Sequence, residues 1–318
     1  MDMDARIVVV GSLNMDLVIR TAHLPAPGET LFGSDFTTAP GGKGANQAVA
    51  AARLGAAVAM VGRTGSDDFG RTLRANLQAD SVDTLHVSED RAAATGVALI
   101  TVEEGGQNTI IVASGANMRV TRADVDGAES VLRAAFGLIV QLEVPLDVVE
   151  YSMRQARQAG LVIVLNPAPA QALSREFLAL ADVLVPNESE ASILTGLTVT
   201  DAESAEAAGR ALSPGGVPAV VITLGEQGAL LWHQDSATFV PPFEVQAVDA
   251  TAAGDAFVGA LTTALLRAPR REALTSASLR LALREASAAG ALTATKGGAQ
   301  PSLPTRAELD QFLRGHTP

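Results

Sequence analysis

The stretch Val248-Asp249-Ala250-Thr251-Ala252-Ala253-Gly254-Asp255 is followed by an apolar run with helical spacing, Phe257 to Leu266, and preceded by a predicted strand, Phe243 to Val248. Small residues therefore lead into a helix whose first turn carries Asp255. The first N–H groups of a helix lack internal partners, and the helix dipole favours negative charge there. The stretch predicts an anion-binding helix start with Asp255 beside it as a proton acceptor. An ordinary helix start with an acidic first turn is the alternative.

A second glycine-rich stretch, Gly41-Gly42-Lys43-Gly44-Ala45-Asn46-Gln47-Ala48, opens a predicted helix that continues to Leu54 and stops at Gly55. Its spacing differs from the Walker A phosphate loop. Glycines permit close approach to a ligand, and Lys43 and Asn46 supply hydrogen-bond donors. A glycine-rich helix start with a solvated Lys43 is the alternative interpretation.

These two motifs resemble the C-terminal and N-terminal signatures of the ribokinase (PfkB-type) family of sugar kinases, and they occur in the family's order. The resemblance implies ATP-dependent phosphorylation of D-ribose at its 5-hydroxyl, with Asp255 as catalytic base. It makes the backbone N–H groups of Ala252, Ala253, Gly254 and Asp255 the anion hole. A kinase for another sugar or a nucleoside, and a sugar-binding sensor without catalysis, remain alternatives. Departures from the family pattern are Ala250, Ala252 and Ala256, which stand where Thr, Gly, and Thr or Ser are more usual.

The resemblance also implies the remaining site residues. The sugar would be held by Asn14, Asp16, Gly42, Lys43, Asn46 and Glu143 together with Asp255. ATP would be bound by Asn187, Thr223, Gly225, Gly228, Gly254 and, near the adenine, Ser287, although the stretch Arg267 to Arg284 looks longer than is usual in the family. Mg²⁺ would lie near Glu190, in the Asn-x-x-Glu motif that begins at Asn187. An activating K⁺ would be bound by Thr293, Lys296, Gly298 and Ser302, with Asp249 and Thr251 opposite.

Apolar runs of strand length alternate with helical patterns along most of the chain. Predicted buried strands are Arg6 to Gly11, Val58 to Gly62, Gly137 to Leu142, Val162 to Leu165, Val183 to Val185 and Ala219 to Leu224. Predicted helices between them include Asp68 to Asp80, Ala123 to Ala135 and Leu146 to Ala159. This alternation predicts an α/β fold with a doubly wound, mainly parallel sheet flanked by helices. Polar residues that follow the strand ends, such as Asn14, Glu143, Asn166 and Asn187, are expected at one edge of that sheet, where ligands bind.

Two further extended pairs lie outside this alternation. Leu17 to Arg20 pairs with Thr30 to Thr38, and Thr95 to Val102 forms a predicted hairpin with Asn108 to Ala113. Together they predict a small sheet, built from about residues 15–40 and 94–114, that covers the site as a lid of a single domain spanning 1–318. Its exposed apolar face favours a homodimer formed through the lid.

Composition limits the classes of partner. The 318 residues carry a formal charge of −12, which argues against nucleic acid or an anionic membrane as a main partner. There is no cysteine, so disulfides and zinc–sulfur sites are excluded. We find neither a signal-peptide pattern nor an apolar run of membrane-spanning length. The sequence predicts a cytoplasmic protein whose partners are small molecules.

Overall fold

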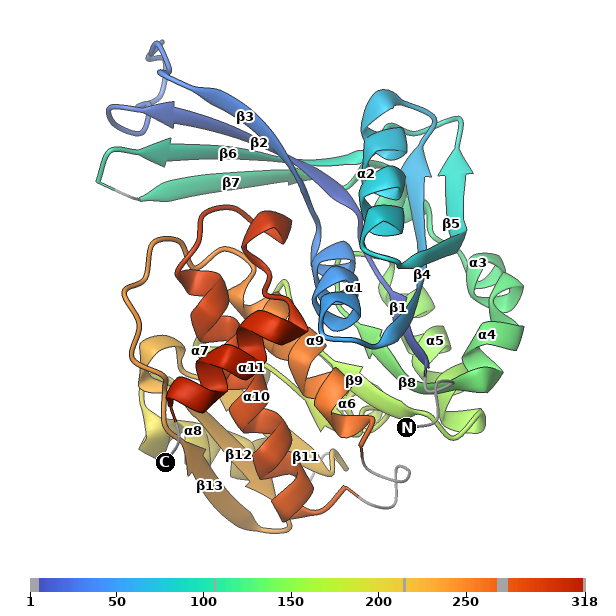
Figure 1. Cartoon of the computed structure of the whole chain (residues 1–318). Coiled ribbons are helices and arrows are strands. Elements are labelled where there is room, and N and C mark those ends of the chain that lie inside the picture. The colour runs from blue at the N-terminus through green and yellow to red at the C-terminus, as the bar shows by residue number, and fades with distance from the viewer. Residues whose placement is uncertain (1–5, 106, 214–215, 268–273, 317–318) are drawn as a thin grey trace.

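The structure is a computed structural model that describes residues 6–105, 107–213, 216–267 and 274–316. In this part of the chain one sheet of nine strands is flanked by helices, and a second sheet of four strands projects from it (Figure 1). The predicted doubly wound, mainly parallel sheet with a small separate sheet is confirmed.

The main sheet has the strand order β13-β12-β11-β10-β9-β8-β1-β4-β5. Its strands in chain order are β1 (Arg6–Val10), β4 (Ala57–Gly65), β5 (Asp83–Asp90), β8 (Ala135–Val140), β9 (Val162–Leu165), β10 (Val183–Leu184), β11 (Ala219–Thr223), β12 (Ala229–His233) and β13 (Ser236–Val240). Neighbours from β5 to β11 pair in parallel, whereas β12 and β13 are antiparallel. The carboxyl ends of the parallel strands therefore meet at one edge of the sheet.

Helices cover both faces of the main sheet (Figure 1). They are α1 (Lys43–Arg53), α2 (Asp68–Ala79), α3 (Arg122–Gly127), α4 (Glu129–Ala134), α5 (Leu146–Gln158), α6 (Arg175–Leu178), α7 (Glu188–Thr195), α8 (Ala202–Leu212), α9 (Ala253–Leu265), α10 (Ser276–Ala294) and α11 (Arg306–Gly315). Alternate residues of β1 enter different cores, as strand geometry requires. Ile7 and Val9 belong to the apolar core that includes residues of α1, α9 and α10, whereas Val8 and Val10 belong to the core that includes residues of α4, α5 and α8.

Two predicted elements have different bounds in the structure. The predicted helix Ala123 to Ala135 is two short helices, α3 and α4, separated at Ala128. Gly127, a poor helix former, ends the first of them. The predicted strand Thr30 to Thr38 pairs as a strand only from Phe36 onward.

The predicted strand Phe243 to Val248 is wrong, because this segment forms no strand. Pro241 and Pro242 precede it and lack the N–H groups that a sheet ladder needs. The Phe243 ring packs instead against Phe312 and His316, with ring centroids 5.3 and 5.6 Å away.

The second sheet has the order β3-β2-β6-β7 and is built from two separate excursions of the chain. Its strands are β2 (Asn14–Thr21), β3 (Phe36–Gly41), β6 (Gly96–Glu103) and β7 (Asn108–Ala113). Along the chain, β2 and β3 come between β1 and α1, and β6 and β7 come between β5 and the 3₁₀-helix η1 (Gly115–Arg119). Parallel pairing of β2 with β6 joins the two excursions. Exposed apolar side chains on this sheet are Ile19, Phe36, Leu99, Ile110, Ile111 and Val112.

Candidate active site

A cavity of about 210 Å³ lies where several strand ends and the start of α9 meet. Its lining residues are Lys43, Asn166, Ala168, Val185, Asn187, Glu190, Thr223, Ala250, Ala252, Gly254, Asp255 and Val258. Residues that the sequence assigned to sugar, nucleotide, magnesium and anion hole are thus brought together. Ala168, Val185 and Val258 carry no polar signal and were not predicted.

The start of α9 has the shape of an anion-binding loop. Ala252, the residue before the helix, has φ 60°, in the left-handed region. The Ala253 N–H donates to the Ala250 carbonyl at 3.1 Å. The N–H groups of Gly254 and Asp255 have no hydrogen-bond partner among the described residues, and the space beside Gly254 is open. These two N–H groups are therefore available to an anion in the cavity.

Asp255 is held by two consecutive side chains of α1. Asn46 Nδ2 donates to Oδ2 and Gln47 Nε2 donates to Oδ1, each at 2.9 Å. Gln47 is itself fixed, because Gln141 Nε2 donates to its Oε1 at 2.6 Å. Burial raises the pKa of Asp255, while Lys43, Asn46 and Gln47 oppose that rise. The carboxylate is oriented and has a raised pKa, as a general base requires.

The glycines of the second motif allow α1 to lie directly on the turn after β1. Gly42 has φ 89°, and a Cβ there would come within 2.7 Å of the Asn14 nitrogen. At the same helix start the Lys43 N–H donates to Glu143 Oε2 at 3.1 Å. The Gly44 N–H donates to Ser12 Oγ at 3.2 Å, and Ser12 Oγ in turn donates to Glu143 Oε2. The backbone of this motif therefore contacts two candidate sugar-binding residues, Asn14 next to Gly42 and Glu143 through the Lys43 N–H.

The charges of Asp255, Glu143 and Glu190 act on the half-buried Lys43, and Asp16 lies close to two of them. Burial, then the charges of Glu143 and Asp255, raise the pKa of Asp16 to about 7. Burial on its own would lower the pKa of Lys43, but Asp255, Glu143 and Glu190 outweigh it and raise that pKa. Lys43 therefore stays charged, and Asp16 titrates near neutral pH.

Asn187 and Glu190 cap the start of α7 and also face the cavity. The Glu190 N–H donates to Asn187 Oδ1 at 2.8 Å, and the Asn187 N–H donates to Glu190 Oε2 at 2.9 Å. Burial raises the pKa of Glu190. Its other oxygen, Oε1, has no partner in the described part of the chain. A single buried carboxylate with one free oxygen fits the way Mg²⁺ binds beside phosphates.

The candidate nucleotide residues are only partly in the cavity. Thr223 lines it, and the loop η3 (Gly225–Gln227) follows. Gly228 has φ 99°, and a Cβ there would come within 2.4 Å of the Val240 carbonyl oxygen. The backbone at this position therefore requires glycine. Ser287 lies on α10 outside the cavity lining, and its buried Oγ has no partner among the described residues. Part of the long stretch Arg267 to Arg284 lies outside the described residues.

The two segments predicted to bind a monovalent cation are joined through Asp249. Its Oδ1 accepts from the Thr251 N–H at 2.9 Å, and its Oδ2 accepts from the Gly298 N–H at 2.9 Å. Lys296 Nζ pairs with Glu308 at 2.6 Å. The hydroxyls of Thr293 and Ser302 donate to carbonyls of their own turns. Among the described residues no group of three or more His, Cys, Asp or Glu side chains is placed for a metal.

The structure adds polar residues that the sequence analysis did not assign. Gln47 orients Asp255, and Asn166 Oδ1 accepts from Gln47 Nε2 at 3.0 Å. Asn117, from η1, contacts Asn14. Gln47 could have been predicted, because it stands next to Asn46 in the glycine-rich motif. Asn117 follows the second excursion, and no local pattern indicates a role for it.

The cavity brings together an oriented, buried carboxylate and free N–H groups, and comparison with known proteins gives the class of protein. Residues 4–306 match the pfkB family of carbohydrate kinases. The chain belongs to that family, and the resemblance seen in the sequence is confirmed.

Individual relatives match between 80% and 98% of the chain. It is 43% identical over 307 residues to the ribokinase of Haemophilus influenzae, covering 96% of this chain and 98% of that protein. It is 39% identical over 254 residues to a deoxyribokinase of Salmonella typhimurium, covering 80% and 83%. The structure of Arabidopsis thaliana ribokinase complexed with ribose and ATP superimposes with a TM-score of 0.87 at 31% identity, covering 98% and 99%.

Proposed function

We propose that this chain is a ribokinase, which transfers the γ-phosphoryl group of ATP to the 5-hydroxyl of D-ribose and releases ribose 5-phosphate and ADP. The observation that carries the proposal is the buried Asp255 carboxylate, oriented by Asn46 and Gln47 beside the free N–H groups of α9. Relatives named ribokinase support the choice of sugar.

The reaction requires a base, an anion hole and countercharge. Asp255 accepts the hydroxyl proton while the sugar oxygen bonds to the γ-phosphorus and the bond to the leaving ADP oxygen breaks. The N–H groups of Gly254 and Asp255, with Ala252 shaping the loop, stabilise the transferring phosphoryl group. Such catalysis is mostly positioning and electrostatics, and general-base action contributes about 10²–10⁴-fold.

The sugar side offers donors and acceptors suited to an uncharged ligand with several hydroxyls. Asp16 and Glu143 supply carboxylate oxygens, and Lys43 supplies an ammonium group. Asn46 Oδ1 is buried and has no partner among the described residues, so it can accept from a ligand hydroxyl. Buried acceptors that gain partners only on binding favour a hydroxylated ligand.

The nucleotide side is assigned to the strand ends and loops. The proposed ATP contacts are Asn187, Thr223, Gly225, Gly228, Gly254 and Ser287. Glu190 would hold Mg²⁺, and Asp249, Thr251 and the loop with Thr293, Lys296, Gly298 and Ser302 would hold K⁺ by carbonyls. When bound, these ions supply positive charge beside the phosphates.

The second sheet is proposed as a lid over the sugar within one domain, and as the contact between two subunits. Its exposed Phe36, Leu99 and Ile111 lie on one face of the sheet and support a homodimer, because apolar sheet faces are normally covered. A concentration-independent monomer mass in sedimentation would contradict this. The described residues include no helix able to cross a membrane, and use of ATP supports a cytoplasmic location.

The test is an ADP-release assay with ribose, 2-deoxyribose, other pentoses, hexoses and nucleosides, in Mg²⁺ with either K⁺ or Na⁺. Highest kcat/KM on ribose is expected. Highest kcat/KM on 2-deoxyribose or a nucleoside would keep the family and overturn the substrate. Sugar binding without turnover on any substrate would favour a sensor instead.

A further inference from the structure

Asn117 ties the segment that leaves the second sheet to the turn between β1 and β2. Its side chain is 1% exposed. Oδ1 accepts from the Leu13 N–H at 2.9 Å, and Nδ2 donates both to the Leu13 carbonyl at 3.1 Å and to Asn14 Oδ1 at 2.7 Å. All the hydrogen-bonding groups of this amide are therefore used on Leu13 and Asn14.

These contacts fix the orientation of two amides in turn. A backbone N–H can only donate, so the Asn117 oxygen must face Leu13 N and its NH₂ group must face the Leu13 carbonyl. That NH₂ group then requires an acceptor on Asn14, which places Asn14 Oδ1 against it. Asn14 Nδ2 is directed the other way and has no hydrogen-bond partner among the described residues. Asn14 thus offers a donor to the site.

The pair is enclosed by the first residue of β6. A Cβ on Gly96 would come within 2.2 Å of Asn14 Oδ1 and 2.4 Å of Asn117 Nδ2. A side chain at this position would displace one of the two amides, so glycine is required for the contact. Both ends of the β6–β7 excursion, Gly96 and η1, therefore meet at Asn14.

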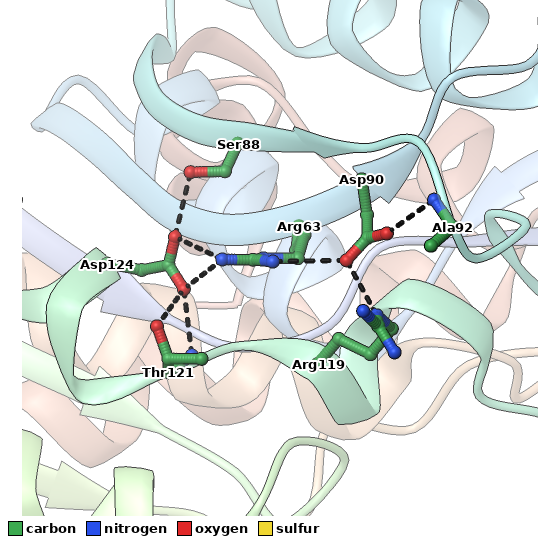
Figure 2. Close-up of polar contacts among 7 residues, drawn as sticks. All are labelled: Arg63, Ser88, Asp90, Ala92, Arg119, Thr121 and Asp124. Carbon is green, nitrogen blue, oxygen red and sulfur yellow. Dashed lines mark hydrogen bonds and ion pairs between the residues drawn. The ribbon is translucent and has the colours of Figure 1, made fainter.

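The other end of η1 is anchored to the main sheet rather than to the second sheet (Figure 2). Arg119 Nε donates to Asp90 Oδ2 at 2.7 Å, and Arg63 Nη1 donates to the same oxygen at 3.1 Å. Arg63 also pairs with Asp124 at 2.8 Å. This network fixes η1 to β4, β5 and α3, so Asn117 presents its amide from a rigid part of the body.

We propose that Asn117 is a positioning residue for the sugar, which fixes the Asn14 amide so that its NH₂ group faces the bound ligand. The inference rests on the proposed function, in which Asn14 binds the sugar. It assigns to η1 a role in sugar affinity although Asn117 reaches the ligand only through Asn14.

The test is a double-mutant cycle of Asn14→Ala and Asn117→Ala, with KM for ribose, KM for ATP and kcat measured for each variant. Each single variant is expected to raise KM for ribose about tenfold, the equivalent of one lost hydrogen bond. KM for ATP and kcat should stay within about twofold. In the Asn14→Ala background, Asn117→Ala should add no further rise in KM, because its effect passes through Asn14.

Fully multiplicative effects on KM in the double variant, or an unchanged KM in Asn117→Ala, would overturn the proposal. If Asn117→Ala does not fold, Asn117→Asp replaces it. The carboxylate still accepts from Leu13 N but cannot donate to Asn14, so KM for ribose should again rise about tenfold. Met118→Ala, on the exposed side of η1, is the matched control and should leave KM unchanged. A wild-type chain without ribose turnover would instead refute the proposed function.

Discussion

Gln47 Nε2 lies 2.9 Å from Asp255 Oδ1, across 208 positions of sequence. The contact joins the start of α1 to the start of α9, so the sugar motif and the anion-hole motif share one hydrogen-bonded carboxylate. Asn46 completes it from the adjacent position. The two motifs are therefore joined through one carboxylate.

Replacing Asp255 with Asn should lower kcat about 10²–10⁴-fold, because the amide cannot accept the hydroxyl proton. Sugar binding should survive, since the new amide oxygen still accepts from Gln47 and Asn46 can turn its free Oδ1 toward the new NH₂ group. Steady-state kinetics and calorimetric titration with ribose measure the two effects. Asp147→Asn, on an exposed side chain, serves as control. Turnover equal to wild type would remove Asp255 from the role of base.

Gln47→Leu should shift the acidic side of the kcat–pH profile to higher pH. Burial already raises the pKa of Asp255, and Gln47 is one of the groups that oppose the rise. Without its N–H the pKa rises further, and the base is protonated over a wider pH range. We expect the loss of kcat relative to wild type to grow as pH falls and to be smallest at high pH.

The profile is to be compared with that of Gln158→Leu, which alters an exposed position on α5. A loss for Gln47→Leu that is equal at every pH would indicate misplacement of Asp255 rather than a change in its pKa.

KM for ribose should rise as pH falls through neutrality. The pKa of Asp16 is raised to about 7, chiefly by burial, and its carboxylate accepts hydroxyl hydrogens at both oxygens, and more strongly, when it is ionised. At pH 6 about one tenth of Asp16 is ionised, so KM should be about tenfold above its value at high pH. Asp16→Asn should have a high KM that no longer changes between pH 6 and 8. A flat wild-type KM would contradict this assignment.

The same residue should make the free protein less stable at high pH. The unfolded carboxyl ionises near pH 3.8 and the folded one near 7, so the folded state binds more protons between these values. Stability is therefore lost as pH rises through that window, by at most about 4 kcal/mol. Asp16→Asn should raise Tm at pH 8 and have little effect at pH 4. Thermal unfolding at both pH values measures this, and a lower Tm at pH 8 would be the opposite result.

Arg53 should set the concentration of K⁺ needed for activity. Its Nη1 donates to the carbonyls of Gln300 and Leu303 at 2.7 and 3.0 Å, and its Nε donates to Asp80 at 2.7 Å. Arg53→Ala removes this support from the turn η5 (Gln300–Ser302), which lies in the proposed cation loop.

Half-maximal activation should then require about tenfold more K⁺, with kcat restored at saturation. Titration of activity with KCl at constant ionic strength measures this, with Arg133→Ala on exposed α4 as control. An unchanged K⁺ response would separate Arg53 from the cation loop.

Local patterns predicted most of the fold and both motifs. The strand β1 and the loop before α9 were predictable because each is determined by a local pattern, a continuous apolar run in one case and a run of small residues in the other. Phe243 to Val248 failed for the converse reason. Its apolar alternation suits a strand, but the prolines before it and the distant rings of Phe312 and His316 decide its conformation.

Side-chain contacts across the fold were beyond prediction from one sequence. Asn14 was a candidate because it follows a strand, but its donor orientation is set by Asn117, 103 positions later. Likewise the glycines of the α1 motif were taken as contacts for a ligand. Gly42 also permits close contact with Asn14 and Leu13, which only the packed structure reveals.

The left-handed backbone of Ala252 has a consequence for when the anion hole acquires its shape. A non-glycine residue with φ near 60° costs about 1 kcal/mol relative to an ordinary conformation. That cost is incurred once, as the chain folds, and glycine would have left the loop free to sample other shapes. The loop is therefore already ordered before the nucleotide binds. Less of the binding free energy is then needed to order it.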